Sequence, residues 1–202
     1  MRRKEQLLVG LTGGIASGKT EVSRELKILG ALILSADEIG REVMDNEPGM
    51  LEWVKAVFGE QFFDAEGKLL RKKLGDLVFS QPEKKKALDD KIFPIIYKRL
   101  LDRIEDGFRQ NKVIVVDAAM IFEWGIEREF DILLTVLSSE KDIKERLSER
   151  DGFDAKQISD RLASQLSPDY KAECSDWVIK NDGDLNDLKS QVRLFWEAVI
   201  NK

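Results

Sequence analysis

The chain has no histidine among its 202 residues and a single cysteine, Cys174. Without histidine, neither a Ser-His-Asp triad nor a two-histidine metal site can form, so a general base must be a carboxylate, lysine, tyrosine or cysteine. One cysteine excludes an intrachain disulfide, which fits a reducing cytosol. Because no histidine is present to activate it, Cys174 is also a poor candidate for a catalytic nucleophile.

Long apolar runs are missing as well. None approaches the roughly 20 residues that span a bilayer, and the basic start at residues 1–6 leads into a short apolar stretch that is not typical of a signal peptide. The net charge of −5 gives no global basic field for nucleic acid or anionic membrane. We therefore expect a cytoplasmic protein that binds neither. The pattern does not define the oligomeric state, for which a monomer or weak oligomer is expected.

The most informative stretch is LLVGLTGGIASGKT at residues 7–20, whose last eight residues fit the P-loop pattern G-x-x-x-x-G-K-S/T. An apolar run precedes the loop and an amphipathic segment follows it, which predicts a strand and then a helix. Glycines let the backbone approach a phosphate, and a helix N-terminus turns free N–H groups toward an anion. Lys19 is expected to reach the β- and γ-phosphates and the Thr20 hydroxyl to ligate Mg²⁺. The residues predicted to bind ATP here are Gly13, Gly14, Ile15, Ala16, Ser17, Gly18, Lys19 and Thr20.

Two aspartates follow predicted buried strands. Asp37 comes just beyond residues 31–34, and Asp117 ends the clearest strand, residues 112–117. Ligands of open parallel sheets collect beyond the carboxyl ends of the strands. Asp117 is therefore a candidate Walker B aspartate that holds Mg²⁺ directly or through water, the alternative being an aspartate that caps a turn. Asp37 is the candidate base that orients or deprotonates an acceptor hydroxyl.

Residues 38–110 show helical patterns and no buried strand, which indicates a helical insertion. Its aromatic side chains are expected to form a core rather than a stacking platform. Strands at 131–137 and 176–181 and a closing helix at 185–200 complete the pattern. It predicts an α/β protein of the P-loop NTPase type: three α/β/α layers, a five-stranded parallel sheet, a helical substrate insertion and a helical lid.

The lid is predicted at residues 141–169, as one charged helix over 141–150 and a second over 153–167. Arg146 and Arg150 are four residues apart and share a helix face, and the second helix adds Arg161. Such a basic pair of helices could close over phosphates. The alternative is a solvated face with intrahelical ion pairs.

The chain resembles the dephospho-CoA kinase family over nearly its whole length, with motifs in the family's order. In the first half these are GLTGGIASGKT at 10–20, GALILSADEIGR at 30–41, and Phe58, Gly59, Gly67, Arg71, Leu74, Val78 and Phe79. In the second half they are DAAMIFE at 117–123, then Arg146, Arg150, Asp151, Arg161 and Gln165, and finally Asp176, Val178, Ile179, Asn181 and Gly183.

The resemblance implies transfer of the ATP γ-phosphate to the ribose 3′-hydroxyl of dephospho-CoA, with ATP as co-substrate and Mg²⁺ as cofactor. It implies a nucleotide-binding core at residues 1–37, 111–140 and 170–202, a CoA-binding domain at 38–110 and a lid at 141–169. The implied catalytic residues are Asp37, Lys19 and Arg146. Arg150 and Asn181 would join the ATP site, the acceptor would contact Asp37, Arg41, Arg71 and Asp117, and the metal would be held by Thr20 and Asp117.

The chain departs from the family pattern at three positions. Ser35 stands where members often have aspartate, so Asp37 alone supplies that carboxylate. Phe93 stands where many have histidine, and Ala119 where they have proline. Two other functions stay open: another small-molecule P-loop kinase, and a switch that uses nucleotide hydrolysis to change partners. A GTPase is disfavoured because no Asn-Lys-x-Asp signature is present.

Overall fold

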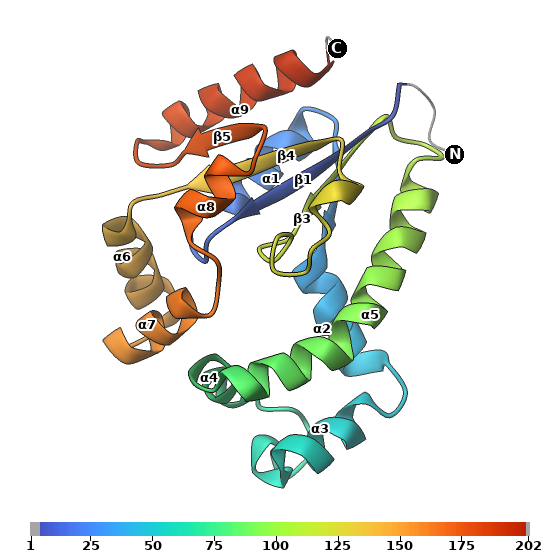
Figure 1. Ribbon diagram of the computed structural model, residues 1–202, viewed down its shortest axis with the longest axis vertical. Helices are drawn as coiled ribbons and strands as arrows, with labels where there is room; N and C mark the ends of the chain where they lie inside the picture. Colours follow the sequence, from blue (N-terminus) through green and yellow to red (C-terminus); the bar gives the residue numbers. More distant parts are fainter. Residues whose placement is uncertain (1–4, 201–202) are drawn as a thin grey trace.

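A computed structural model describes residues 5–200. Its centre is one five-stranded sheet in the order β2-β3-β1-β4-β5, with every paired strand parallel. The P-loop strand β1 is the middle strand (Figure 1). The predicted five-stranded parallel sheet is confirmed. Its strands are β1 (Leu7–Gly13), β2 (Leu32–Ser35), β3 (Val113–Asp117), β4 (Ile132–Leu137) and β5 (Trp177–Lys180).

The strands bury both faces, because successive side chains point to opposite sides of a sheet. On β3, Val113 and Val115 pack into the cluster that contains α1 (Lys19–Ile28) and α9 (Leu185–Ile200). Ile114, between them, packs into the opposite cluster, which continues into the helical insertion. The predicted three-layer α/β/α arrangement is confirmed.

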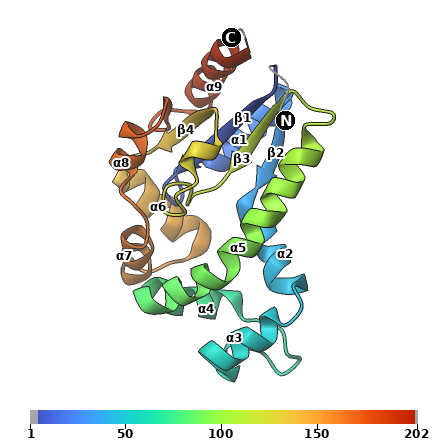
Figure 2. The same cartoon turned by 45° about the vertical axis from the view of Figure 1, so that its right-hand side comes forward.

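Four helices follow β2 and form the insertion, which extends away from the sheet in Figures 1 and 2. The last of them runs through Pro94 as one helix and bends in Figure 1, as expected for an internal proline. The four are α2 (Ala36–Asn46), α3 (Met50–Phe58), α4 (Arg71–Ser80) and α5 (Pro82–Gly107), with a 3₁₀ turn at Glu60–Phe62.

The aromatic side chains of the insertion form its core, as predicted. Phe58 and Phe62 are buried, and Trp53, Phe63 and Phe79 pack around them, partly buried. Each of these side chains removes apolar area from water, which stabilises the fold by about 25 cal/mol per Å² buried. The insertion therefore folds around its own apolar centre, which is continuous with one face of the sheet.

Three short helices follow β4: α6 (Glu140–Asp151), α7 (Ala155–Ala163) and α8 (Pro168–Glu173). The predicted helix over residues 153–167 is too long, and α8 was not predicted. The physical reason is that a new helix begins at Pro168. Ser167 is its N-cap, and the Ser167 hydroxyl accepts a hydrogen bond from Tyr170 N at 3.1 Å. A further 3₁₀ turn occupies Glu127–Glu129. None of the helices within residues 5–200 has the length and apolarity needed to cross a membrane.

Helix α7 lies beside α4 in both views (Figures 1 and 2). Arg161 joins them, since its Nη2 lies 2.7 Å from Asp76 Oδ1 and its guanidinium lies 3.7 Å from the Phe153 ring centre. Only 4% of Arg161 is exposed. The expectation that Arg161 shares the basic face of Arg146 and Arg150 is therefore wrong, because the chain reverses between α6 and α7.

Candidate active site

The P-loop joins β1 to α1 in a conformation that requires its glycines. Gly13 has φ 147° and Gly18 has φ 103°, values that disfavour side chains. A Cβ on Gly18 would lie 2.1 Å from Asn181 Nδ2, and one on Gly13 would lie 2.5 Å from Val136 O. The two motif glycines thus allow close packing of the loop against the ends of the neighbouring strands.

Side chains from distant segments hold the loop carbonyls. Asn181, just after β5, donates from Nδ2 to Ser17 O at 2.8 Å. Arg146, on α6, donates from Nη1 to Ala16 O at 3.1 Å and to Ser138 Oγ at 3.0 Å. Both residues were predicted at the nucleotide site, and both lie against the loop. In this arrangement the Arg146 guanidinium fixes the loop's shape.

The segment that follows α7 is tied to the same loop. Ile15 N donates to Gln165 Oε1 at 3.0 Å, and Leu166 N donates to Glu123 Oε1 at 2.9 Å. Glu123 Oε1 also pairs with Lys171 Nζ at 2.7 Å, where the lysine side chain is fully buried. Burial lowers the pKa of Lys171, and the glutamate opposes that effect.

This buried pair supports the loop that follows β3. Lys171 Nζ donates to Ala119 O at 2.6 Å, and Thr12 Oγ1 donates to the same oxygen at 3.2 Å. Sequence reasoning missed Lys171 and gave Glu123 only as a motif position. A lysine in a short polar segment gives no signal of burial, because burial here depends on how α8 packs on β4.

Three charged groups gather at the base of the loop. Lys19 Nζ donates to Gly13 O at 3.2 Å and to Gly14 O at 3.3 Å. Burial lowers the pKa of Lys19, while the charges of Asp117 and Asp37 oppose the shift. Both predicted aspartates are therefore close enough to Lys19 to favour its charged form.

Asp117 is held by a residue that sequence reasoning missed. Ser23 Oγ, on α1, donates to Asp117 Oδ2 at 2.7 Å. Burial raises the pKa of Asp117, and the charge of Lys19 and the Ser23 hydrogen bond act against it. The sequence held a signal for Ser23, because it is a polar side chain on the buried face of the amphipathic helix α1.

Asp37 stands on the first turn of α2, which begins at Ala36 and not, as predicted, at Glu38. The helix starts there because the Ser35 hydroxyl accepts a hydrogen bond from Glu38 N at 3.2 Å. The first departure from the family pattern thus serves as a helix N-cap. It places the exposed Asp37 carboxylate at the end of β2, beside the P-loop cavity.

One cavity of about 680 Å³ lies over the P-loop and α1. The P-loop residues from Ile15 to Thr20 line it, together with most of the other predicted site residues. Gly13 and Gly14 do not line it; Gly13 is the last residue of β1 and Gly14 follows it. The other predicted residues that line it are Asp37, Asp117, Arg146, Arg150 and Asn181. Arg150 is exposed and pairs with its neighbour Asp151 at 2.8 Å, so it is less constrained than Arg146.

Two predicted acceptor residues lie outside this cavity. Arg41 is exposed on α2 and donates from Nε to Asp37 O at 3.3 Å. Arg71, at the start of α4, pairs with the Asp45 carboxylate. The structure therefore does not bring Arg71 to the P-loop, and its predicted contact with acceptor stays a prediction.

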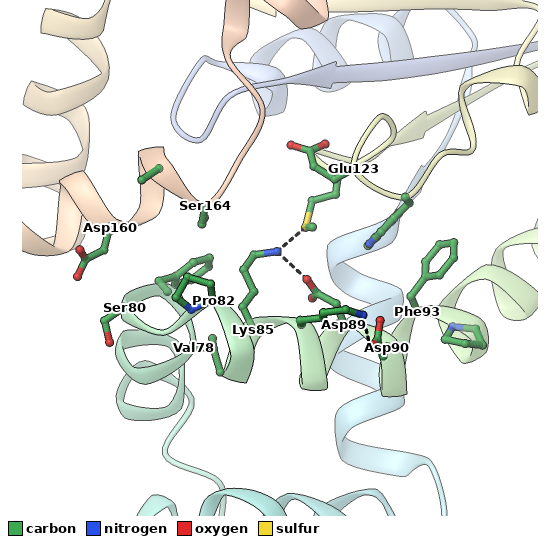
Figure 3. A pocket seen from close by; sticks show the side chains of 16 residues that line it. Val78, Ser80, Pro82, Lys85, Asp89, Asp90, Phe93, Glu123, Asp160 and Ser164 are labelled. Atoms are coloured by element: carbon green, nitrogen blue, oxygen red, sulfur yellow. Dashed lines mark hydrogen bonds and ion pairs between the residues drawn. The ribbon is translucent and has the colours of Figure 1, made fainter.

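A second cavity, of about 750 Å³ (Figure 3), shares part of its lining with the first. It lies between α5, the end of α4, the loop after β3 and α7. Phe93 on α5 stacks on Trp124, with ring centres 5.0 Å apart and planes at 30°. Phe93, the second departure from the family pattern, therefore contributes an aromatic wall. The residues that line both cavities are Phe79, Lys85, Met120 and Ser164.

The donor set fits a metal that arrives with a nucleotide. Within residues 5–200, no group of three or more Asp, Glu, Cys or His side chains could hold an ion by itself. Mg²⁺ is usually bound by one or two carboxylates together with waters and substrate phosphates. One aspartate, Asp117, and the hydroxyl of Thr20 at the start of α1 satisfy that requirement.

A P-loop on the central strand, with a carboxylate beyond the neighbouring strand and a second cavity alongside, defines a small-molecule kinase of the P-loop class. The family model of dephospho-CoA kinase matches residues 7–187. The chain belongs to the dephospho-CoA kinase family.

Curated relatives agree with this assignment, and solved structures share the fold. The dephospho-CoA kinase of Staphylococcus aureus strain Mu50 is 34% identical over 190 residues, 94% of this chain and 92% of the relative. That of Enterococcus faecalis is 33% identical over 195 residues, 96% of this chain and 98% of the relative. A Thermus thermophilus crystal structure has a TM-score of 0.78 at 27% identity, covering 96% of this chain and 98% of the other. A shikimate kinase from Acinetobacter baumannii, at 14% identity and TM-score 0.55 over 98% and 95% of the two chains, shares the fold.

Proposed function

We propose that this protein transfers the γ-phosphate of ATP to the ribose 3′-hydroxyl of dephospho-CoA, giving CoA and ADP. The observation that carries the proposal is the pair of adjoining cavities, one built on the P-loop and one on the helical insertion. A kinase for two large substrates requires both. Family membership supports the choice of acceptor.

The donor side would hold the ATP phosphates through the loop amides from Gly13 to Thr20, at the N-terminus of α1. Lys19 now donates to the loop carbonyls of Gly13 and Gly14. When ATP binds, phosphate oxygens would replace these carbonyls as the hydrogen-bond acceptors of the Lys19 ammonium, because a charged acceptor binds it more strongly than a carbonyl does. Arg146 would contribute charge from above the loop, and Arg150 and Asn181 would complete the nucleotide site.

We assign the Mg²⁺ site to Thr20 and Asp117. When bound with ATP, the ion would neutralise charge on the transferring phosphoryl group. Ser23 orients the Asp117 carboxylate through one oxygen. The second oxygen is the one we assign to the metal or to its waters.

Asp37 is the residue that we assign to the acceptor hydroxyl. It is exposed to the cavity, near enough to Lys19 and Asp117 for their charges to interact. An ionised carboxylate there can accept the 3′-hydroxyl proton as the phosphoryl group is transferred. Positioning of the two substrates would supply the rest of the rate enhancement.

The acceptor side is assigned to the insertion, residues 38–110, with residues 141–169 as a lid and residues 1–37, 111–140 and 170–202 as the nucleotide-binding core. The aromatic wall of Phe93 and Trp124 offers a surface for the adenine or the apolar arm of dephospho-CoA. Arg41, one turn after Asp37 on α2, and Arg71 on α4 are assigned to the acceptor as well. We place the reaction in the cytoplasm, which the exposed, unpaired Cys174 fits, and expect a monomer or weak oligomer.

The test is an acceptor panel read by ADP release. Dephospho-CoA is compared with nucleoside monophosphates, nucleosides and sugars at equal concentration, with Lys19→Ala as the inactive control. The proposal predicts rapid ADP release with dephospho-CoA and little with the others. Preference for another acceptor, or slow ADP release that no acceptor changes, would overturn it in favour of another kinase or of a nucleotide-dependent switch.

A further inference from the structure

We propose that Lys85 determines acceptor specificity by binding the diphosphate of the acceptor where the two cavities meet. The inference rests on the proposed function and deepens it. Lys85 lies on α5, in the insertion, and its side chain lines both the P-loop cavity and the second cavity. Among the four described residues that line both, it is the charged one.

Figure 3 shows the Lys85 side chain extending from α5 into the second cavity, with its ammonium between the Asp89 carboxylate and the Met120 sulfur. Its ammonium lies 2.6 Å from Asp89 Oδ2 and 3.9 Å from the Met120 sulfur, on the loop that follows β3. Only 15% of the side chain is exposed. An ammonium held this far from solvent has lost much of its hydration, so an anion that enters can bind it strongly.

The charges on the wall of the second cavity single out this lysine. The carboxylates of Asp89, Asp90, Glu123 and Asp160 line the cavity, so an anionic acceptor needs a cation there. Lys86 lines it too, but 74% of its side chain is exposed, and it lies outside the P-loop cavity. Lys85 is therefore placed to bind the acceptor anion close to the reacting hydroxyl.

The donor phosphates have other partners. They are assigned to the loop amides, Lys19 and Arg146, all on the core and lid side of the P-loop cavity. Lys85 comes from the insertion, on the acceptor side. When the acceptor binds, a diphosphate oxygen would replace the Asp89 carboxylate as the ion-pair partner of the Lys85 ammonium. The 3′-hydroxyl and the 5′-diphosphate of the acceptor belong to one ribose, so a cation at the border of the two cavities can hold one group while Asp37 faces the other.

The experiment measures kcat and KM for Lys85→Met with dephospho-CoA, and the slow turnover of adenosine, an acceptor that lacks the diphosphate, at high concentration. We expect the KM for dephospho-CoA to rise by about 10–100-fold, the loss expected for a charge-assisted hydrogen bond. The KM for ATP should change by less than about twofold, and adenosine turnover should be unaffected within the same margin. Lys85→Arg, which keeps the charge, should restore most of the affinity for dephospho-CoA.

Two variants on the same helix serve as matched controls. Lys86→Met removes the neighbouring lysine, whose 2.6 Å pair with Asp90 mirrors that of Lys85 with Asp89. It should leave both KM values within about twofold. Asp89→Asn frees the Lys85 ammonium and should leave unchanged or lower the KM for dephospho-CoA.

Several results would overturn the inference. If Asp89→Asn raises the KM as much as Lys85→Met does, the ion pair within α5 matters for local structure and the lysine does not bind the acceptor. If Lys85→Met lowers kcat equally with dephospho-CoA and adenosine, the lysine acts on the transferring phosphoryl group instead. An active wild type with an unchanged Lys85→Met would overturn this inference alone, whereas a wild type inactive on dephospho-CoA would overturn the proposed function as well.

Discussion

The two sides of the candidate site are held in different ways. Around the P-loop, polar side chains reach across the chain, as in the Asn181 to Ser17 hydrogen bond between residues 164 positions apart. On the first half of α5, the charged pairs are local, since Lys85 and Lys86 each pair with an aspartate one turn ahead. The proposed donor side is thus held by tertiary contacts, while Lys85 and Lys86 on the proposed acceptor side are held by pairs within one helix, which a substrate can exchange.

The largest effect is expected from Lys171→Met, which removes the buried ion pair with Glu123 on the proposed donor side. The substitution removes the partner of Glu123, whose side chain is 12% exposed. An unpaired buried charge costs about 3–5 kcal/mol, and we expect the free energy of unfolding to fall by that amount in urea titrations at neutral pH.

The double variant Lys171→Met with Glu123→Gln is the control, because it removes both charges. It should recover more than half of the lost stability. A loss below about 1 kcal/mol for Lys171→Met alone would mean that this pair contributes no more than a surface pair, and that the contrast between the two sides does not hold.

Asp37→Asn should lower kcat by about 10²-fold or more if the carboxylate accepts the hydroxyl proton. The KM values should change little, because asparagine has nearly the same shape and Asp37 is exposed. Steady-state kinetics with dephospho-CoA provide the measurement, with circular dichroism to confirm the fold. Turnover near that of the wild type would refute the assignment of Asp37 as base.

Asp117→Asn should raise the Mg²⁺ concentration needed for half-maximal turnover by about 10–100-fold. Burial raises the pKa of Asp117, so its carboxylate becomes protonated at a higher pH than that of an ordinary aspartate. In the wild type, the Mg²⁺ requirement should therefore increase as the pH falls below neutrality, and more steeply than in Asp117→Asn, where only protonation of the ATP phosphates contributes. Titration of Mg²⁺ at several pH values measures both effects, and parallel pH profiles would contradict the metal role.

The smallest effect is expected on the acceptor side, at the pair that joins α5 to α2. Arg99 Nη2 lies 2.6 Å from Glu47 Oε2, and the two side chains are 31% and 30% exposed. Arg99→Ala should lower the free energy of unfolding by less than about 1 kcal/mol, since water and salt screen such pairs. Urea titration at low and high salt tests this, and a loss above about 2 kcal/mol would show that the acceptor side is as firmly built as the donor side.

Sequence pattern predicted the elements whose causes are local. The helices at Met50–Phe58 and Leu185–Ile200 were placed with their exact bounds, because apolar periodicity and turn residues mark them. The P-loop, Asp37 and Asp117 were also found, since glycine spacing and strand ends are properties of short segments. The predicted lid arginine Arg146 lies against the loop, four residues from Arg150 on the same helix.

What the pattern could not give depends on packing between segments. Arg161 was grouped with the phosphate-facing arginines, yet it lies buried between α7 and α4. Ser23 lies on the helix predicted after the P-loop, and Lys171 lies in a segment with no predicted element, yet each supports the loop or strand end that carries Asp117. Burial of Lys171 follows from how α8 packs on β4, and no local pattern encodes that.

The most direct test of the account identifies the product. The wild type is incubated with ATP, Mg²⁺ and dephospho-CoA, and the mixture is followed by phosphorus NMR and mass spectrometry. The account predicts equal amounts of ADP and of CoA with a new phosphomonoester on the ribose 3′-oxygen. ADP accompanied by inorganic phosphate, with dephospho-CoA unchanged, would contradict it.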